Sequence, residues 1–119
     1  NETIINDLID ASDFLPTMLD ISDIKNTDLM DGKSFYPQIL GNKGNPRDWI
    51  YFYFDPNSPR LDRPVMEFVR EKKWKLYSDN RMFDVLNDPN ETKEIFFDQD
   101  SETQEAYNNL KNILENIKN

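Results

Sequence analysis

The stretch Lys73–Glu91, which reads KWKLYSDNRMFDVLNDPNE, decides the fold. Two short strand-like runs, KWKLYS and RMFDVL, flank the polar tripeptide Ser78-Asp79-Asn80. Aspartate and asparagine can adopt the left-handed backbone that a tight hairpin turn requires, so the stretch predicts two antiparallel strands. The cluster Asn87-Asp88-Pro89-Asn90-Glu91 follows at once. Because proline cannot donate to a strand ladder, this cluster predicts the end of the sheet.

Two further strands are predicted upstream of this hairpin. The continuous aromatic run WIYFYF (residues 49–54) indicates a strand that is buried on at least one face. The run VMEFVRE (residues 65–71) is joined to the hairpin by a tight turn near Glu71–Lys72. A long irregular connection with three prolines, residues 55–64, separates the two runs. The other connections are short and sequential, which predicts a four-stranded antiparallel meander.

Helical patterns precede and follow the strands. Apolar residues at helical spacing predict a helix over Phe14–Ile21, with Asp13 as its N-cap. Residues 22–48 contain all three glycines and many Asn and Asp, and predict a loop with a short helical turn near Ser34–Leu40.

The C-terminal segment predicts a second, longer helix. Ser101-x-x-Gln104 matches a capping box. One apolar helical face follows, which we expect to lie on the sheet: Ala106, Tyr107, Leu110, Ile113, Leu114 and Ile117. The predicted fold class is α+β: a small four-stranded antiparallel sheet with a C-terminal helix packed on it, preceded by a short helix and a long loop.

Composition excludes several classes of function. The chain has 119 residues, which favours one domain. Its net charge of -9 argues against nucleic acid and against anionic membranes as partners. No apolar run approaches the roughly 18 residues that span a bilayer. The absence of Cys and His excludes disulfides, thiolate metal sites, a Cys nucleophile and a Ser–His–Asp triad.

No residue pattern completes a catalytic or metal site. Asp98, Asp100 and Glu102 alternate as calcium ligands do, but the Gly and the terminal bidentate Glu of a calcium loop are missing. Acidic residues at a helix start are better explained by the helix dipole. The Lys-rich, aromatic residues 72–77 resemble a stacking platform, but at this net charge a solvated hairpin edge is the better interpretation. We therefore predict no catalytic residue and no metal site in this chain.

The order of five motifs is more informative than any single residue. Together they resemble the C-terminal portion of sulfatases of the arylsulfatase type, in the alkaline-phosphatase-like superfamily. The first resembles the family's D-L-x-P-T-L-L-D-L, and the last its L-Y-D-L-x-x-D-P-x-E. In chain order the motifs are DFLPTMLDI (13–21), MDGKSFYPQILG (30–41), GNPRDWIYFYFDP (44–56), FVREKKWKLY (68–77) and MFDVLNDPNE (82–91).

The resemblance implies a division of the chain and of the enzyme. Residues 1–47 would be a helix and loop segment from the end of the catalytic domain, and residues 48–119 the C-terminal subdomain. The family's nucleophile motif C/S-x-P-x-R, its calcium site and its catalytic His and Lys lie upstream of this region. The resemblance thus places the formylglycine and the calcium outside this chain, and we expect the 119 residues alone to be inactive. The chain starts on Asn1 and not on Met, as we expect of a C-terminal fragment of a longer protein.

By resemblance, the chain would support the catalytic domain and shape the rim of the substrate site. The candidate rim residues lie on and after the aromatic run: Tyr53, Asp55, Arg60 and Arg63. Either arginine could hold an anionic sugar through a bidentate contact, although a solvated loop arginine is commoner. The partners implied are the sulfatase's own catalytic domain and, through it, a sulfated, carbohydrate-type substrate.

Two alternatives stay open at this point. The chain could be the C-terminal part of a related phosphodiesterase or phosphonate hydrolase, or a free-standing non-catalytic binding module. A sulfatase fragment should expose an apolar patch where the catalytic domain docks, around Ile4, Ile5, Leu8, Ile9 and Phe14. A dimer formed through that patch would be an artefact of cutting. The family resemblance also implies a periplasmic or secreted enzyme.

Three positions depart from the family pattern: Asp23, Lys72 and Asn80. Asp23 stands where the family usually has the Gly that ends the first helix, and neither hairpin turn contains Gly. Because Asp tolerates a left-handed backbone less well than Gly, the exact turn types are in question.

Overall fold

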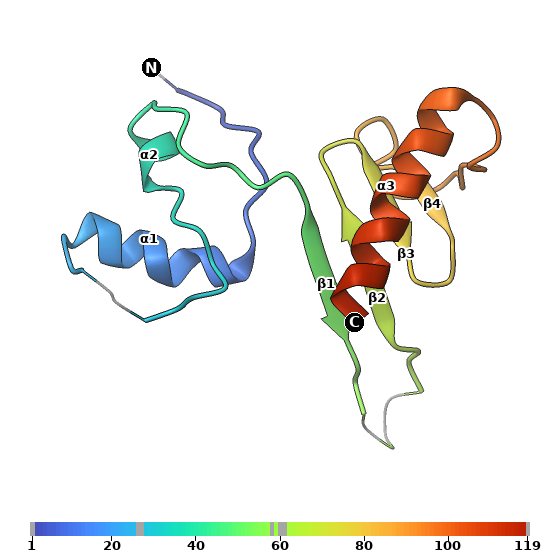
Figure 1. Cartoon of the computed structure of the whole chain (residues 1–119), viewed down its shortest axis with the longest axis horizontal. Coiled ribbons are helices and arrows are strands. Elements are labelled where there is room, and N and C mark those ends of the chain that lie inside the picture. Colours follow the sequence, from blue (N-terminus) through green and yellow to red (C-terminus); the bar gives the residue numbers. More distant parts are fainter. Residues whose placement is uncertain (1, 26–27, 58, 60–61, 119) are drawn as a thin grey trace. The chain divides into compact units, whose positions relative to one another are not determined.

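A computed structural model describes residues 2–25, 28–57, 59 and 62–118. The contacts divide the chain into two compact units, Asn1–Ile50 and Tyr51–Asn119 (Figure 1). The boundary predicted between residues 47 and 48, and the assignment of the first 47 residues to a catalytic domain, stay predictions.

The first unit is built from short helices and loops. It contains the 3-10 helix η1 (Ala11–Asp13), helix α1 (Phe14–Ile21) and the single turn α2 (Tyr36–Ile39). The helix predicted over Phe14–Ile21 is confirmed, and α2 lies within the predicted turn. Asp23, just after α1, has a φ of 53°, so the aspartate adopts the left-handed backbone usually given to Gly.

Asp13 does not cap α1 as predicted. It precedes the helix, but its side chain makes no capping hydrogen bond. The reason is that a turn of 3-10 helix comes first and is capped by Asp10, whose carboxylate accepts from the Ser12 N–H. Asp13 is thus already in helical backbone, with φ -80° and ψ -16°, and its carboxylate is free for other partners.

The second unit contains the predicted sheet. Its strands lie in the order β1 (Ile50–Phe54), β2 (Met66–Arg70), β3 (Trp74–Tyr77) and β4 (Met82–Asp84). Adjacent strands run in opposite directions (Figure 1), with Phe68 opposite Tyr77 and Lys75 opposite Phe83. The four-stranded antiparallel meander is therefore confirmed.

The stretch that predicted the hairpin folds as expected. Asn80 has a φ of 71°, the left-handed backbone that the β3–β4 turn needs. β4 ends at Asp84, and in the turn that follows the carboxylate of Asp88 accepts from the N–H groups of Thr92 and Lys93. The chain then returns, and the Ile95 N–H donates to the Met82 carbonyl at 2.8 Å.

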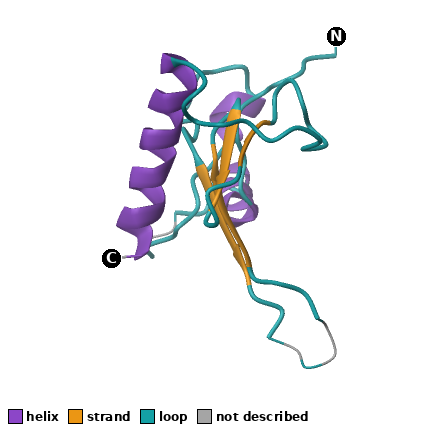
Figure 2. Ribbon diagram, turned by 90° about the vertical axis from the view of Figure 1, so that its right-hand side faces the viewer, coloured by secondary structure: helices purple, strands orange, loops and turns teal. Residues whose placement is uncertain are grey.

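Helix α3 (Ser101–Lys118) packs on one face of the sheet, against β2 and β3 (Figure 2). This confirms the predicted packing, except that Ile117, which was also predicted to lie on the sheet, is 37% exposed. The buried core that they share consists of Val69, Trp74, Leu76, Met82, Ala106, Leu110 and Leu114. The predicted capping box is displaced by one residue: the Thr103 N–H donates to Asp100 and the Asp100 N–H to Thr103. Asp and Ser are equally good caps, so capping propensity alone did not identify which of the two would cap α3.

Strand β1 departs from its prediction. Tyr51 is half-buried against the core, but the other aromatic side chains of the strand, Phe52, Tyr53 and Phe54, are 39%, 54% and 46% exposed. β1 lies at the edge of the sheet, and α3 packs on β2 and β3 instead. None of the helices in the described part of the chain is long and apolar enough to cross a membrane.

Candidate functional site

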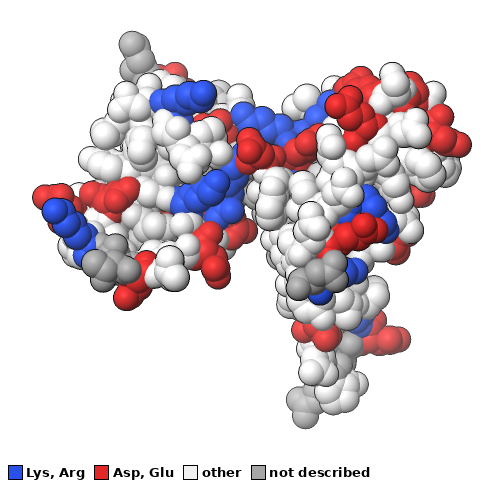
Figure 3. Space-filling view, in the orientation of Figure 1, with Lys and Arg blue, Asp and Glu red and all other residues white. Residues whose placement is uncertain are grey.

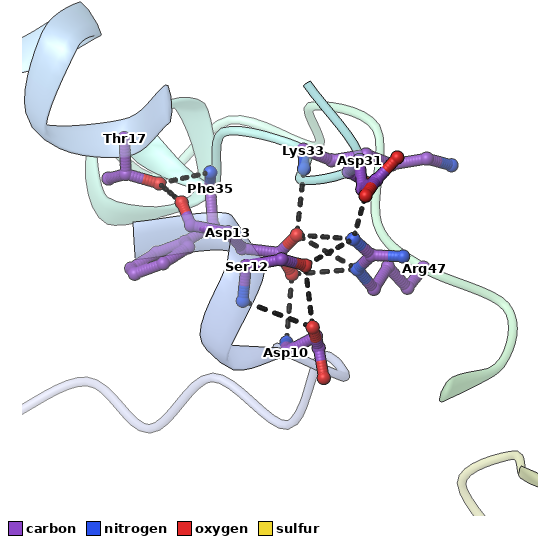
Figure 4. Close-up of polar contacts among 8 residues, drawn as sticks. All are labelled: Asp10, Ser12, Asp13, Thr17, Asp31, Lys33, Phe35 and Arg47. Carbon is purple, nitrogen blue, oxygen red and sulfur yellow. Dashed lines mark hydrogen bonds and ion pairs between the residues drawn. The ribbon is translucent and has the colours of Figure 1, made fainter. Parts of the chain in front are cut away.

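The polar cluster of the first unit is centred on Asp13, which is 2% exposed (Figure 4). Its carboxylate accepts hydrogen bonds from Nε and Nη2 of Arg47. The Lys33 N–H donates to the same carboxylate at 2.7 Å, and the Asp10 N–H at 2.8 Å. Four N–H groups from three segments of the chain therefore meet at one buried carboxylate.

Further hydrogen bonds extend this cluster. Arg47 Nη2 also donates to the Asp31 carbonyl at 3.1 Å. Thr17 Oγ1, itself buried, donates to the Asp13 carbonyl at 2.7 Å and accepts from the Phe35 N–H at 3.0 Å (Figure 4). The cluster thus ties α1 to the 31–35 loop and to the approach to β1.

The electrostatics of this cluster describe an ion pair and not a catalytic group. Burial raises the pKa of Asp13, but the hydrogen bonds from Arg47 and from the backbone outweigh it, so the pKa lies below its ordinary value. The hydrogen bond to Asp13 raises the pKa of Arg47. Both groups are therefore charged at neutral pH. Because the lone pairs of the carboxylate are already engaged by donors, Asp13 is poorly suited to act as a general base.

A second polar cluster lies on the sheet of the second unit. Glu91 accepts from Lys75 Nζ at 3.1 Å and from the Tyr77 hydroxyl at 2.7 Å. Lys75 Nζ also lies 3.9 Å from the ring centroid of Phe68. Burial and the neighbouring Glu91 raise the pKa of Tyr77, so its hydroxyl stays protonated. This cluster, like the first, is internally paired.

The structure gives positions to three of the four predicted rim residues. Tyr53 is an exposed residue of β1, and Asp55 follows the strand and accepts from the Asn57 N–H at 2.9 Å. Arg63 is exposed in the segment just before β2. Arg60 lies outside the described residues. Since β1 and β2 are antiparallel neighbours, Tyr53, Asp55 and Arg63 come from one end of the sheet; their role at a substrate rim stays a prediction.

A shallow hollow of about 230 Å³ lies between the start of β2 and the β3–β4 turn, and Pro64, the residue after Arg63, is part of its lining. One of its walls is Arg81, whose guanidinium lies 4.5 Å from the ring centroid of Tyr77 and whose Nε donates to Asp79 at 2.8 Å. Sequence reasoning did not select Arg81. Basic and acidic side chains are interleaved over both units on the face that Figure 3 shows.

Sequence reasoning also missed the Asp13–Arg47 pair. Both residues lie in quoted motifs, DFLPT and NPRDW, but they are 34 positions apart and nothing in either motif indicates the partner. Over residues 2–25, 28–57, 59 and 62–118, no group of three or more His, Cys, Asp or Glu side chains could hold a metal ion.

Comparison with known proteins shows the family and the fold. A family model described as N-sulphoglucosamine sulphohydrolase, C-terminal, matches residues 1–119. No curated protein sequence matches the chain.

Solved structures of sulfatases share its fold. One is a protein from Bacteroides thetaiotaomicron VPI-5482 whose sulfatase assignment is provisional, with 19% identity over 87% of this chain and a TM-score of 0.68. Another is a 2-O GAG sulfatase, with 21% identity over 88% of this chain and a TM-score of 0.69. The chain spans 23% of the length of each. By the family match over its whole length, this chain belongs to the sulfatase family described as the C-terminal region of N-sulphoglucosamine sulphohydrolase.

Proposed function

We propose that this chain is the C-terminal part of a sulfatase, an enzyme that hydrolyses sulfate esters, in which it supports the catalytic domain and shapes the substrate rim. The observation that carries the proposal is the family match over all 119 residues. In this proposal the catalytic domain holds the calcium and the formylglycine, both outside this chain. The calcium would act there as a Lewis acid on the sulfate group.

The surface of the first unit supports the proposed docking to a catalytic domain. Of the predicted apolar patch, Ile4, Ile5, Ile9 and Phe14 are exposed, and Leu8 is half-buried. The buried side chains described in this unit are polar: Asp13, Thr17 and Gln38. An apolar exterior around a polar interior is typical of a surface that another domain covers. We propose that the catalytic domain covers it, and that a dimer of the isolated chain through this patch would be an artefact.

The proposed substrate is a sulfated carbohydrate. The names of the matching family and of the GAG sulfatase both refer to sulfated sugars. Tyr53, Asp55, Arg60 and Arg63 would line the rim, where an arginine guanidinium can bind a sulfate group with two parallel hydrogen bonds. Export to the periplasm or the medium is part of the same proposal.

The test is an assay of sulfate release by the full-length protein and by the 119-residue chain. The substrates are N-sulfated glucosamine, a 2-O-sulfated disaccharide and 4-methylumbelliferyl sulfate, with bis(p-nitrophenyl) phosphate as the phosphodiester comparison. We expect the full-length protein to release sulfate and the 119-residue chain to release none. Turnover of the aryl sulfate would assign the arylsulfatase type.

Two results would contradict this proposal. Cleavage of the phosphodiester without any sulfate release would assign the related hydrolase class instead. Sulfate release by the 119-residue chain alone would show that its catalytic residues lie within this chain. In the active full-length protein, Arg63→Gln should raise KM and leave kcat unchanged, whereas Lys43→Gln, in an exposed loop of the first unit, should change neither.

A further inference from the structure

The sheet has a second apolar face, opposite the one that α3 covers. Side chains alternate between the faces along each strand. Val69, Leu76 and Met82 contact α3, so their strand neighbours point the other way. We call this opposite surface the second face; it is formed by Phe52, Phe54, Met66, Phe68, Lys75, Tyr77 and Phe83.

Aromatic rings run across all four strands on the second face. Phe52 stacks on Phe68 with ring centroids 4.9 Å apart, and Phe68 meets Tyr77 edge-on at 5.5 Å. Tyr77 in turn meets Phe83 at 5.9 Å. Each ring comes from a different strand, so the second face is one continuous aromatic surface.

The two halves of the second face differ in burial. Phe83, on β4, is 6% exposed. On β1 and β2, Phe52, Phe54 and Met66 are all more than a third exposed. Because β1 is an edge strand, exposed apolar residues there would also invite pairing with other chains unless something covers them.

The polar groups of the second face already have partners within this chain. Glu91 accepts from both Lys75 and Tyr77. Arg70, at the other end of β2, is not part of the proposed contact; it donates to the neutral Glu71 carbonyl at 3.3 Å. An apolar protein surface could therefore cover the Phe52–Tyr77 region and leave no buried charge without a partner. A sulfated ligand fits this region poorly, because the charge of Lys75 is already neutralised.

We propose that the β1–β2 half of the second face docks an uncharged, apolar surface of the catalytic domain of the same sulfatase. This inference rests on the proposed function and names the contact surface in the sheet. The occupant follows from chain length: this chain matches 23% of each similar sulfatase, so most of such an enzyme is joined to this fold by the same chain. A covalently joined domain reaches this surface at a high effective concentration.

The test is hydroxyl-radical footprinting of the full-length protein, native and urea-unfolded, with mass spectrometry of its peptides. We expect the native protein to protect Phe52, Phe54 and Met66 by about tenfold or more, as strongly as the buried Met82. Phe96, which is 62% exposed and outside the second face, is the matched control and should be protected only weakly. Equal, weak protection of Met66 and Phe96 would overturn the inference.

Two additional measurements distinguish an error in the proposed occupant of the second face from an error in the proposed function. Protection of Met66 that grows with protein concentration would show that a second copy covers the face, and would overturn the proposed occupant. Sulfate release is measured on the same sample. Sulfate release without protection contradicts the docking surface alone; concentration-independent protection without sulfate release supports the docking surface and contradicts the proposed function.

Discussion

The interiors of the two units of this chain differ in polarity. In the first, the buried side chains described are polar, whereas large apolar side chains of α1 are exposed: Phe14, Leu15, Met18 and Ile21. In the second, α3 and the sheet enclose an apolar core that includes Val69, Leu76 and Leu110, each 0% exposed. One short chain therefore combines a unit held together mainly by hydrogen bonds and an ion pair with a unit held together mainly by the burial of apolar side chains.

The difference has an energetic consequence. Burying one large aliphatic side chain contributes about 1.5–3 kcal/mol, whereas one hydrogen bond contributes a net of about 1 kcal/mol. The second unit therefore has its own source of stability. The first unit depends on a few paired groups and, in the proposed enzyme, on the catalytic domain that would cover its apolar surface.

The largest expected effect comes from breaking the buried pair of the first unit. Arg47→Ala would leave the Asp13 carboxylate buried without its cation, at a cost of about 3–5 kcal/mol. Native-state hydrogen exchange at the α1 amides measures this loss locally. Arg81→Ala removes an ion pair whose partners are both half-exposed, and should cost less than about 1 kcal/mol. Equal losses for the two variants would show that Asp13–Arg47 is not a structural crosslink.

A somewhat smaller loss is expected from the apolar core. Leu110→Ala removes a fully buried side chain between α3 and the sheet and should lower the unfolding free energy of the second unit by about 2–4 kcal/mol. Urea unfolding followed by the fluorescence of Trp74, a core residue, measures it. Leu86→Ala, at a position 65% exposed, is the control and should change stability by no more than about 0.5 kcal/mol.

Two glycines of the first unit differ in how closely the surrounding backbone approaches them. A Cβ added to Gly32 would lie 1.8 Å from the Ser12 carbonyl oxygen, so Gly32→Ala should destabilise the first unit by about 2–3 kcal/mol. Gly41→Ala meets no atom within 4 Å but must adopt a φ of 85°, at a cost of about 1 kcal/mol. Hydrogen exchange at α1 distinguishes the two. A larger loss for Gly41→Ala would contradict the close approach at Gly32.

The smallest effect is a pH dependence confined to acid. The folded-state pKa of Asp13 lies below its ordinary value of 3.8, so its stabilising contribution is present above that value. The contribution is lost as the pH falls through the folded-state pKa. Protection of the α1 amides should therefore weaken below about pH 3.8, and Asp13→Asn should reduce this dependence. An unchanged slope in Asp13→Asn would assign the titration to other carboxylates, such as Asp10.

Local chemistry in the sequence predicted the elements, and failed where the outcome depended on distant partners. The Ser78-Asp79-Asn80 turn and the apolar face of α3 are properties of a few neighbouring residues, and both are confirmed. The burial of β1 was predicted wrongly, because hydrophobicity alone does not show that α3 packs on β2 and β3. Asp13 has the sequence features of an N-cap, but the turn that Asp10 caps places Asp13 in helical backbone, and its carboxylate binds Arg47, 34 residues away.

The candidate rim could be predicted from the sequence only as a set of residue types in one connection. Three of these residues come from one end of the sheet because β1 pairs with β2. Local sequence patterns do not predict the pairing of two strands that are separated by a long connection. The hollow between the start of β2 and the β3–β4 turn depends on that turn, which lies well beyond the connection in the sequence. Arg81 was missed for the same reason.

Asn80 joins the β3–β4 turn to helix α3. Its left-handed backbone closes the β3–β4 turn, and its Oδ1 accepts from Tyr107 at 3.2 Å and Lys111 at 2.9 Å on α3. Glycine would satisfy the backbone but would remove this link over 31 residues. The turn can form early, because it is local, but its side-chain bonds form only when α3 arrives. We therefore expect Asn80→Gly to leave the folding rate nearly unchanged and to accelerate unfolding; this result would identify the docking of α3 as a late step.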